Sequence, residues 1–125
     1  MSAHLKTEII AVGPDVAELV GDGVLILFGA DAPPELAEVS VLHAPLAPIA
    51  DEAPVCGTPI TIGPVTTTIT AVGPTAWKKA GEIGHVVFNF NGATTAERPG
   101  EICAGVVDTA VLTAALKVGQ TIAIG

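Results

Sequence analysis

The stretch TEIIAVGP at residues 7–14 recurs sixty positions later as TTITAVGP at residues 67–74. In both copies β-branched residues lead into a Gly-Pro pair, which is the pattern of a strand that ends in a turn. A second copy of a strand-turn unit at a fixed distance indicates an internal repeat. We therefore expect a chain built from two similar halves.

The match continues on both sides of this stretch. Gly21 and Phe28 recur as Gly81 and Phe88 at the same offset. After a slip of two residues, a glycine and isoleucine pattern near the end of the first half also recurs: Gly57, Ile60, Ile62 and Gly63 correspond to Gly119, Ile122, Ile124 and Gly125. Chance repetition in a strand-rich chain is the alternative. We predict halves at residues 1–63 and 64–125 within one domain, because 125 residues suffice for a single core.

Glycine and proline divide the rest of the chain into short β-branched or alternating runs, which predict strands. The predicted strands cover residues 7–12, 24–28, 39–43, 59–62, 65–72, 85–90, 101–106 and 121–124. Short helices are predicted at 15–20 and 75–80, and 109–116 is compatible with a helix or a loop. Neither half can bury its apolar faces alone. We therefore predict an all-β fold with one or two short helices, a pseudo-twofold closed or partly open β-barrel.

Charge and composition exclude several classes of function. With 5 Lys and Arg against 13 Asp and Glu, the net charge of −8 opposes binding to nucleic acid or to an anionic membrane surface. No apolar run is long enough to span a bilayer, and no signal peptide is visible at the start, so we expect a cytoplasmic protein that is not inserted in a membrane. The two cysteines, Cys56 and Cys103, are expected to be free and mostly buried thiols.

Common catalytic and cofactor motifs are missing from the sequence. There is no closely spaced His or Cys pair of the kind that binds metals, and a cluster of His43, His85 and Cys103 is the one conceivable exception. Ser2 and Ser40 are the only serines, and neither lies in the Gly-x-Ser-x-Gly motif of hydrolases. Nucleotide-binding glycine motifs are also missing. We predict no metal and no cofactor.

His43 is the residue best placed to carry chemistry. Under the offset of sixty it corresponds to Cys103, and a position that differs between the halves is freer to be functional than one that both halves share. It ends a predicted strand, where a side chain is expected to be accessible. Its ring is nucleophilic when neutral, and the usual pKa of about 6.5 leaves most of it neutral near pH 7. A structural histidine at a strand end is the alternative.

Two further residues are candidates for a supporting role. His85 opens a predicted strand after Gly84 and could orient His43 or bind an anion, although a buried structural histidine is equally compatible with its position. Arg98 lies in the turn Glu97-Arg98-Pro99-Gly100 and could bind a phosphate, with a solvated turn residue as the alternative. The acid pairs of the chain are expected to be surface carboxylates.

Several segments together resemble one known family. They are ITAVG at 69–73, EIGHV at 82–86, Phe88, FNG at 90–92 and ERPG at 97–100, with LILF at 25–28, LAE at 36–38 and Leu42-His43 in the first half. Their order and spacing resemble the enzyme IIA component of the glucitol/sorbitol phosphotransferase system, over nearly the whole chain.

The resemblance implies a phosphohistidine carrier. Such a protein accepts a phosphoryl group from the carrier protein HPr and passes it to enzyme IIB of a sugar permease, which acts with the membrane component IIC. The residue that matches the acceptor is His43. His85 is then expected to assist it and Arg98 to stabilise the phosphate. A partner-docking patch is expected at Leu42, Leu46 and Ile49, with an acidic rim that attracts a basic partner.

A second interpretation stays open from the sequence. The chain could be a non-catalytic small β-barrel that binds a partner or regulates it, with His43 in a structural role. The residues Ala44-Pro45-Leu46 favour this interpretation slightly, because they differ from the histidine and glycine that follow the acceptor in the family.

Overall fold

The computed structural model describes residues 3–125, which form eight strands and four short helices. The strands are β1 (Leu5–Val12), β2 (Val24–Gly29), β3 (Val41–Pro45), β4 (Pro59–Ile62), β5 (Val65–Val72), β6 (Val86–Asn89), β7 (Glu101–Ala104) and β8 (Thr121–Ile124). The helices are α1 (Val16–Gly21), α2 (Pro34–Ala37), α3 (Ala76–Ile83) and α4 (Thr109–Ala115). Each predicted strand is present, with ends that shift by up to two residues.

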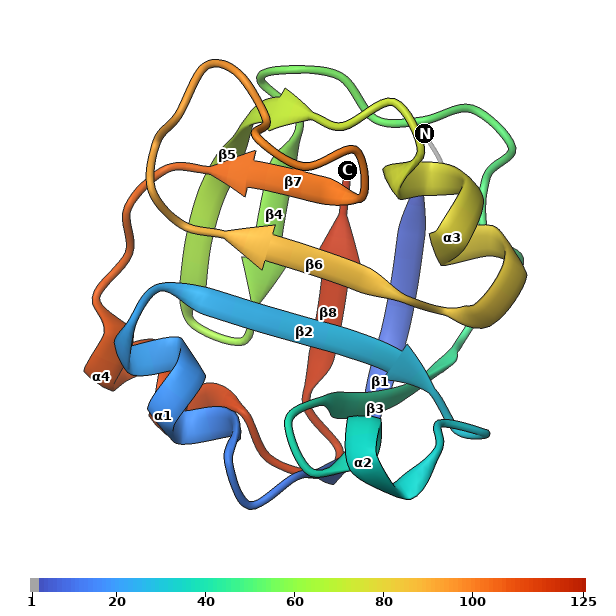
Figure 1. Cartoon of the computed structure of the whole chain (residues 1–125), viewed down its shortest axis with the longest axis vertical. Coiled ribbons are helices and arrows are strands. Elements are labelled where there is room, and N and C mark those ends of the chain that lie inside the picture. The colour runs from blue at the N-terminus through green and yellow to red at the C-terminus, as the bar shows by residue number, and fades with distance from the viewer. Residues whose placement is uncertain (1–2) are drawn as a thin grey trace.

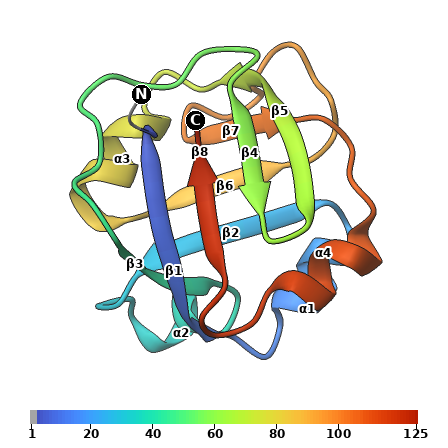
Figure 2. The same ribbon diagram turned by 180° about the vertical axis from the view of Figure 1, so that it is seen from behind.

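The strands close into a barrel in the order β1-β3-β2-β6-β7-β5-β4-β8. Figure 1 shows β2 and β6 crossing the front of the barrel, and Figure 2 shows β1, β8 and β4 on the opposite side. Closure pairs both edges of every strand, which removes the exposed sheet edges that an open half would leave. The predicted barrel of two similar halves is confirmed.

The pairing pattern of the first four strands recurs in the last four. β1 is antiparallel to β3 as β5 is to β7, and β2 is parallel to β3 as β6 is to β7. The register shifts between Ile9 and Ala11 in β1 and again between Ile69 and Ala71 in β5. Only β2–β6 and β4–β8 join equivalent strands of the two halves. The pseudo-twofold relation inferred from the repeat therefore extends to individual register shifts.

Alternation along each strand separates the barrel interior from the outer face. In β2, Leu25 and Leu27 belong to the apolar core, whereas Phe28 lies outside that cluster. The interior is filled by large side chains with almost no exposure, among them Phe88 and Ile102. Burial of this kind contributes about 1.5–3 kcal/mol per large side chain.

The helices lie outside the barrel and connect its strands. α1 and α3 confirm the two predicted helices, and α4 settles the ambiguous segment as a helix that begins where Asp108 accepts from the backbone N–H groups of Ala110 and Val111. The four-residue α2 was not expected, because only Pro34 marks its start. Within residues 3–125, no helix combines the length and apolar character needed to cross a membrane.

Candidate functional site

His43 lies in the middle of β3, with its ring inside the barrel. Its neighbours are Ile9 on the antiparallel strand β1 and Gly29 on the parallel strand β2. The side chain is 1% exposed. The expectation of an accessible residue at a strand end is therefore wrong, because β3 continues to Pro45, which pairs with Thr7.

Both ring nitrogens of His43 have hydrogen-bond partners. Nε2 lies 2.8 Å from the carbonyl oxygen of Gly84, and Nδ1 lies 2.6 Å from Oγ1 of Thr7. A carbonyl oxygen can only accept, so Nε2 carries a hydrogen and donates it to Gly84. In the neutral ring Nδ1 is then the acceptor, and the Thr7 hydroxyl donates to it. The contacts therefore define one tautomer.

Gly84 presents its carbonyl to His43 because of the way α3 ends. The backbone N–H of Gly84 donates to Ala80, which is the bond of an αL cap, and that of His85 donates to Lys79. Gly84 has a φ of 69°, a left-handed conformation that favours glycine. A Cβ at this residue would lie 2.9 Å from the backbone nitrogen of Gly29. The end of α3 thus lies against the backbone of β2 and covers the ring of His43.

The surroundings of His43 favour its neutral form. Burial lowers the pKa of the imidazole below its usual value of 6.5, and the hydrogen bond to the Gly84 carbonyl opposes this effect to a smaller degree. The ring is therefore neutral at pH 7, which is the form with nucleophilic character.

This lowered pKa predicts a pH-dependent stability. As the pH falls below about 6.5, the unfolded chain takes up a proton that the folded protein resists, so the free energy of unfolding should decrease. The stability that comes from the neutral His43 ring is fully present above about pH 6.5. Urea unfolding at about pH 7.5 and 5.5 measures the free energy of unfolding at each pH. Its decrease between the two should be smaller in a His43→Gln variant than in the wild type. An unchanged pH dependence in the variant would contradict the assignment.

His85 and Arg98 lie together on the outer face of the barrel, and His85 directly follows Gly84, whose carbonyl contacts the ring of His43. The imidazole of His85 stacks on Phe28, with 5.0 Å between the ring centroids. A cavity of about 320 Å³ is lined by His85, Arg98 and Lys79. Burial, and then the charge of Lys79, lower the pKa of His85. Among the described residues, no hydrogen bond joins His43 to His85 or to Arg98.

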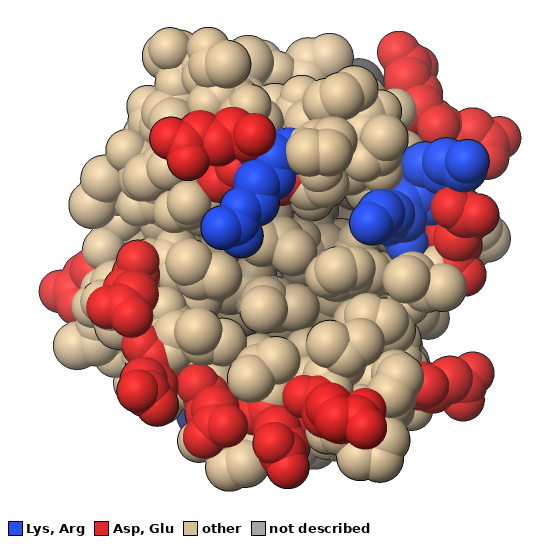
Figure 3. Space-filling view, viewed as in Figure 1, with Lys and Arg blue, Asp and Glu red and all other residues tan. Residues whose placement is uncertain are grey.

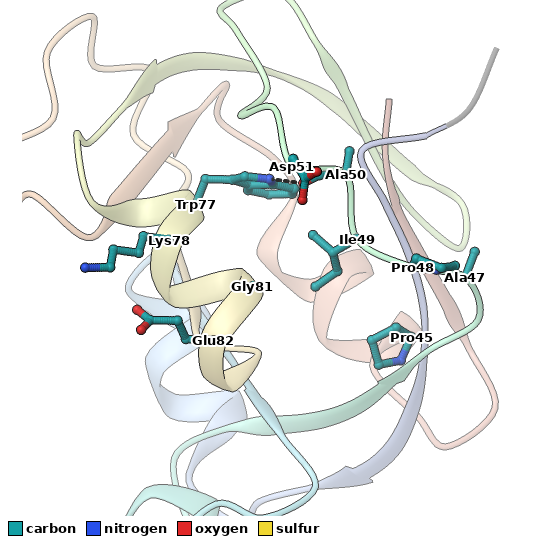
Figure 4. A pocket seen from close by; sticks show the side chains of 10 residues that line it. All are labelled: Pro45, Ala47, Pro48, Ile49, Ala50, Asp51, Trp77, Lys78, Gly81 and Glu82. Atoms are coloured by element: carbon teal, nitrogen blue, oxygen red, sulfur yellow. Dashed lines mark hydrogen bonds between the residues drawn. The ribbon is translucent and has the colours of Figure 1, made fainter.

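A cavity of about 540 Å³ lies between α3 and the segment 45–51, which begins at the last residue of β3. Figure 4 shows Ile49 pointing toward α3 and the indole of Trp77 donating to the carbonyl of Ala50. Of the three residues of the expected docking patch, only Ile49 lines this cavity. Leu46 is 52% exposed beside it, whereas Leu42 is half-buried and pairs with Phe28.

Charged side chains are unevenly spread over the face shown in Figure 3. Figure 3 shows carboxylates along the lower edge of the face, over α1 and α2, while Lys and Arg atoms gather higher, toward β7 and α3. The stretch from Thr7 to Trp77 contains no Lys or Arg. Asp31 and Glu82 line a further cavity, of about 270 Å³, that also includes Gly29 and Ile83 and so adjoins the sealed end of α3.

The two cysteines differ in exposure, and the conceivable metal cluster is not formed in residues 3–125. Cys103 is buried, and burial together with the nearby Glu101 raises its pKa to about 11, so its thiol stays protonated at neutral pH. Cys56 is exposed, contrary to expectation, because it lies in a turn between β3 and β4. His43, His85 and Cys103 do not converge as metal ligands within the described part of the chain.

Thr7 and Gly84 are the contacts of His43 that the sequence did not single out. Thr7 corresponds to Thr67 in the repeat, and a position that both halves share was expected to be less free for function than one that differs. In the structure the two threonines differ, since Thr67 donates to the carbonyl of Gly105. The sequence carried no signal for the contact of Thr7 with His43, because it left the order of the strands in the barrel open.

Comparisons with known proteins identify the family and the fold. The family model described as "PTS system glucitol/sorbitol-specific IIA component" matches residues 4–124. The glucitol/sorbitol-specific EIIA components of Shigella flexneri and of Escherichia coli K12 are each 30% identical over 108 residues, covering 82% of this chain and 81% of theirs. The crystal structure of a PTS system IIA component from Enterococcus faecalis V583 has the same fold, with a TM-score of 0.73, 20% identity and coverage of 94% of this chain and 97% of that one. This chain therefore belongs to the family of glucitol/sorbitol-specific IIA components of the phosphotransferase system.

Proposed function

We propose that His43 accepts a phosphoryl group from the phosphohistidine of HPr and passes it to enzyme IIB of a glucitol- or sorbitol-type permease, which works with the membrane component IIC. The observation that carries the proposal is the state of the His43 ring. The ring is neutral, and Thr7 and Gly84 hold it in one orientation. The residue at the same position in the second half of the repeat is Cys103, whose thiol stays protonated at neutral pH. A reaction with HPr and enzyme IIB would take place in the cytoplasm.

The proposed reaction needs little beyond alignment. Transfer of a phosphoryl group between two imidazoles depends on placing donor nitrogen, phosphorus and acceptor nitrogen in line and on stabilising the oxygens around phosphorus. Backbone N–H groups and cationic side chains can do this without a metal. In this proposal His85 and Arg98, joined by Lys79, bind the phosphoryl oxygens from the outer cavity as the group approaches the end of α3.

Docking of the partners is proposed over the same end of α3. Ile49 and the exposed Leu46 offer apolar surface there, and Leu42 extends it along β3. The carboxylates of Asp31 and Glu82 supply an acidic rim. A partner with basic residues around its own reactive histidine would be attracted to such a rim, mainly through its rate of association.

Phosphorylation in a reconstituted system tests the proposal. Incubation with enzyme I, HPr and labelled phosphoenolpyruvate should add one phosphate per chain, labile in acid and stable in base, and mass spectrometry should locate it on the peptide that contains His43. Addition of the matching enzyme IIB should then remove the label. A chain that takes up no phosphate, or takes it up on another residue, would refute the proposal.

A non-catalytic binding module is the second candidate. The 1% exposure of His43 and the hydrogen bonds to both of its nitrogens favour it, because a structural histidine would have the same contacts. It predicts that the labelling experiment stays negative while binding to a permease component persists.

A further inference from the structure

The proposed function leaves one question about the resting protein, since His43 has no free nitrogen. Nε2 donates to the Gly84 carbonyl and Nδ1 accepts from the Thr7 hydroxyl. A nitrogen attacks phosphorus with its lone pair, and neither lone pair is available in this arrangement. A reactive His43 therefore requires one of these two contacts to be given up.

The contact with Gly84 is the one that can open. It is made by the end of a helix, and Ile83 beside it is 49% exposed. The end of this helix is held by two backbone hydrogen bonds, one of 3.1 Å from Gly84 to Ala80 and one of 3.3 Å from His85 to Lys79. Helix ends of this kind open locally at low cost compared with core strands. Thr7, by contrast, is 0% exposed and lies within β1, which is paired on both sides.

We propose that Thr7 is a positioning residue for phosphoryl transfer: its hydroxyl reverses its hydrogen bond with Nδ1 when the Gly84 carbonyl withdraws, and so makes Nε2 the accepting nitrogen. This inference rests on the proposed function. A hydroxyl suits the task because it both donates and accepts, and its hydrogen rotates freely about the C–O bond. Carbonyls can only accept and backbone N–H groups can only donate, so neither could serve both states.

Once Gly84 withdraws, the ring exchanges its Nε2 hydrogen for one on Nδ1 through solvent, and Nδ1 then donates to Thr7 Oγ1. The Nε2 lone pair forms the new N–P bond while the N–P bond of the donor phosphohistidine breaks, and the electron pair of that bond returns to the donor nitrogen. The hydrogen on Nδ1 stays in place, and the His43 ring becomes positively charged. Thr7 then accepts a charge-assisted hydrogen bond, which is stronger than the one it donated at rest.

Two substitutions at Thr7 test the inference against a matched control. Thr7→Val keeps the shape of the side chain and removes the hydroxyl, so phosphorylation by HPr should slow about tenfold or more. Thr7→Ser keeps a hydroxyl and should react within about twofold of wild type. Thr67→Val removes the equivalent hydroxyl of the other half, which is partly buried and bonded to Gly105, and should leave the rate unchanged. Equal rates for Thr7→Val and wild type would overturn the inference.

Nitrogen NMR of the His43 ring shows which ring nitrogen carries the hydrogen and which carries the phosphate. A purely structural role for Thr7 would not change this assignment between the two states. At rest the hydrogen should be on Nε2; in the phosphorylated protein the phosphate should be on Nε2 and the hydrogen on Nδ1. Phosphate on Nδ1 would overturn the inference even if a variant failed to fold. Failure of wild-type labelling would instead refute the proposed function, and the resting tautomer would still report whether Thr7 donates to Nδ1.

Discussion

Replacement of His43 by glutamine is expected to reduce phosphorylation of the chain to background. An amide nitrogen has no available lone pair for attack on phosphorus, so the acceptor is lost. The fold should persist, because a glutamine amide can donate to the Gly84 carbonyl and its oxygen can accept from Thr7. Phosphate incorporation from labelled phosphoenolpyruvate is the measurement, with thermal unfolding recorded on the same preparation.

His85→Gln is the matched control for this experiment. His85 shares the neutral imidazole but lies on the outer face against Phe28, so its loss should slow the reaction without abolishing it. A His43→Gln protein that is folded and still labelled would exclude His43 as the acceptor. Complete loss of labelling in His85→Gln, with His43 intact, would place the acceptor in the outer cavity instead.

Substitution of alanine for Gly13 or Gly73 should destabilise the protein by about 3 kcal/mol or more, the largest effect on stability that we expect. A Cβ at Gly13 would lie 2.2 Å from the carbonyl oxygen of Ala37, and one at Gly73 would lie 2.3 Å from that of Pro99. Backbone atoms cannot be moved aside as the end of a flexible side chain can. Since domains of this size have about 5–15 kcal/mol of stability, such a loss is severe.

Gly21→Ala provides the comparison, because a Cβ at Gly21 meets nothing within 4 Å. Gly21 is the last residue of α1, where alanine should be neutral or slightly stabilising. Urea unfolding curves of the three variants measure the differences. Similar midpoints for Gly13→Ala, Gly73→Ala and Gly21→Ala would show that the backbone contact at the Gly-Pro turns is not a constraint on the fold.

Much of the fold could be predicted because its signals are local. The Gly-Pro turns after β1 and β5 and the β-branched runs between turns depend on neighbouring residues only. The repeat then supplied the non-local part, since the halves had to bury their apolar faces on each other. The short α2 escaped prediction because four residues carry too little periodicity, and the 109–116 segment became a helix through the cap at Asp108 and its buried Leu112.

The candidate site was predicted less completely. His43 was identified by its difference from Cys103 and by the family resemblance, whereas the idea that a difference between the halves marks function pointed away from Thr7. His85 and Arg98 were expected to assist His43; they line one cavity with Lys79, while the hydrogen-bond partners of His43 are Thr7 and Gly84. Side chains alternate along β2. Phe28, which stacks on His85, faces outward, and the neighbouring Gly29 pairs with His43.

The sequence by itself determined a barrel of two similar halves with one distinctive histidine, because turn residues, strand propensity and internal repetition are all properties of the chain read in order. Only the tertiary structure decided that His43 is buried, which nitrogen carries its hydrogen and what seals it. Those features arise where the end of α3 meets β1, β2 and β3, segments that lie far apart in the chain. Register and the direction of a single carbonyl set the chemistry there, and both result from closure of the whole barrel.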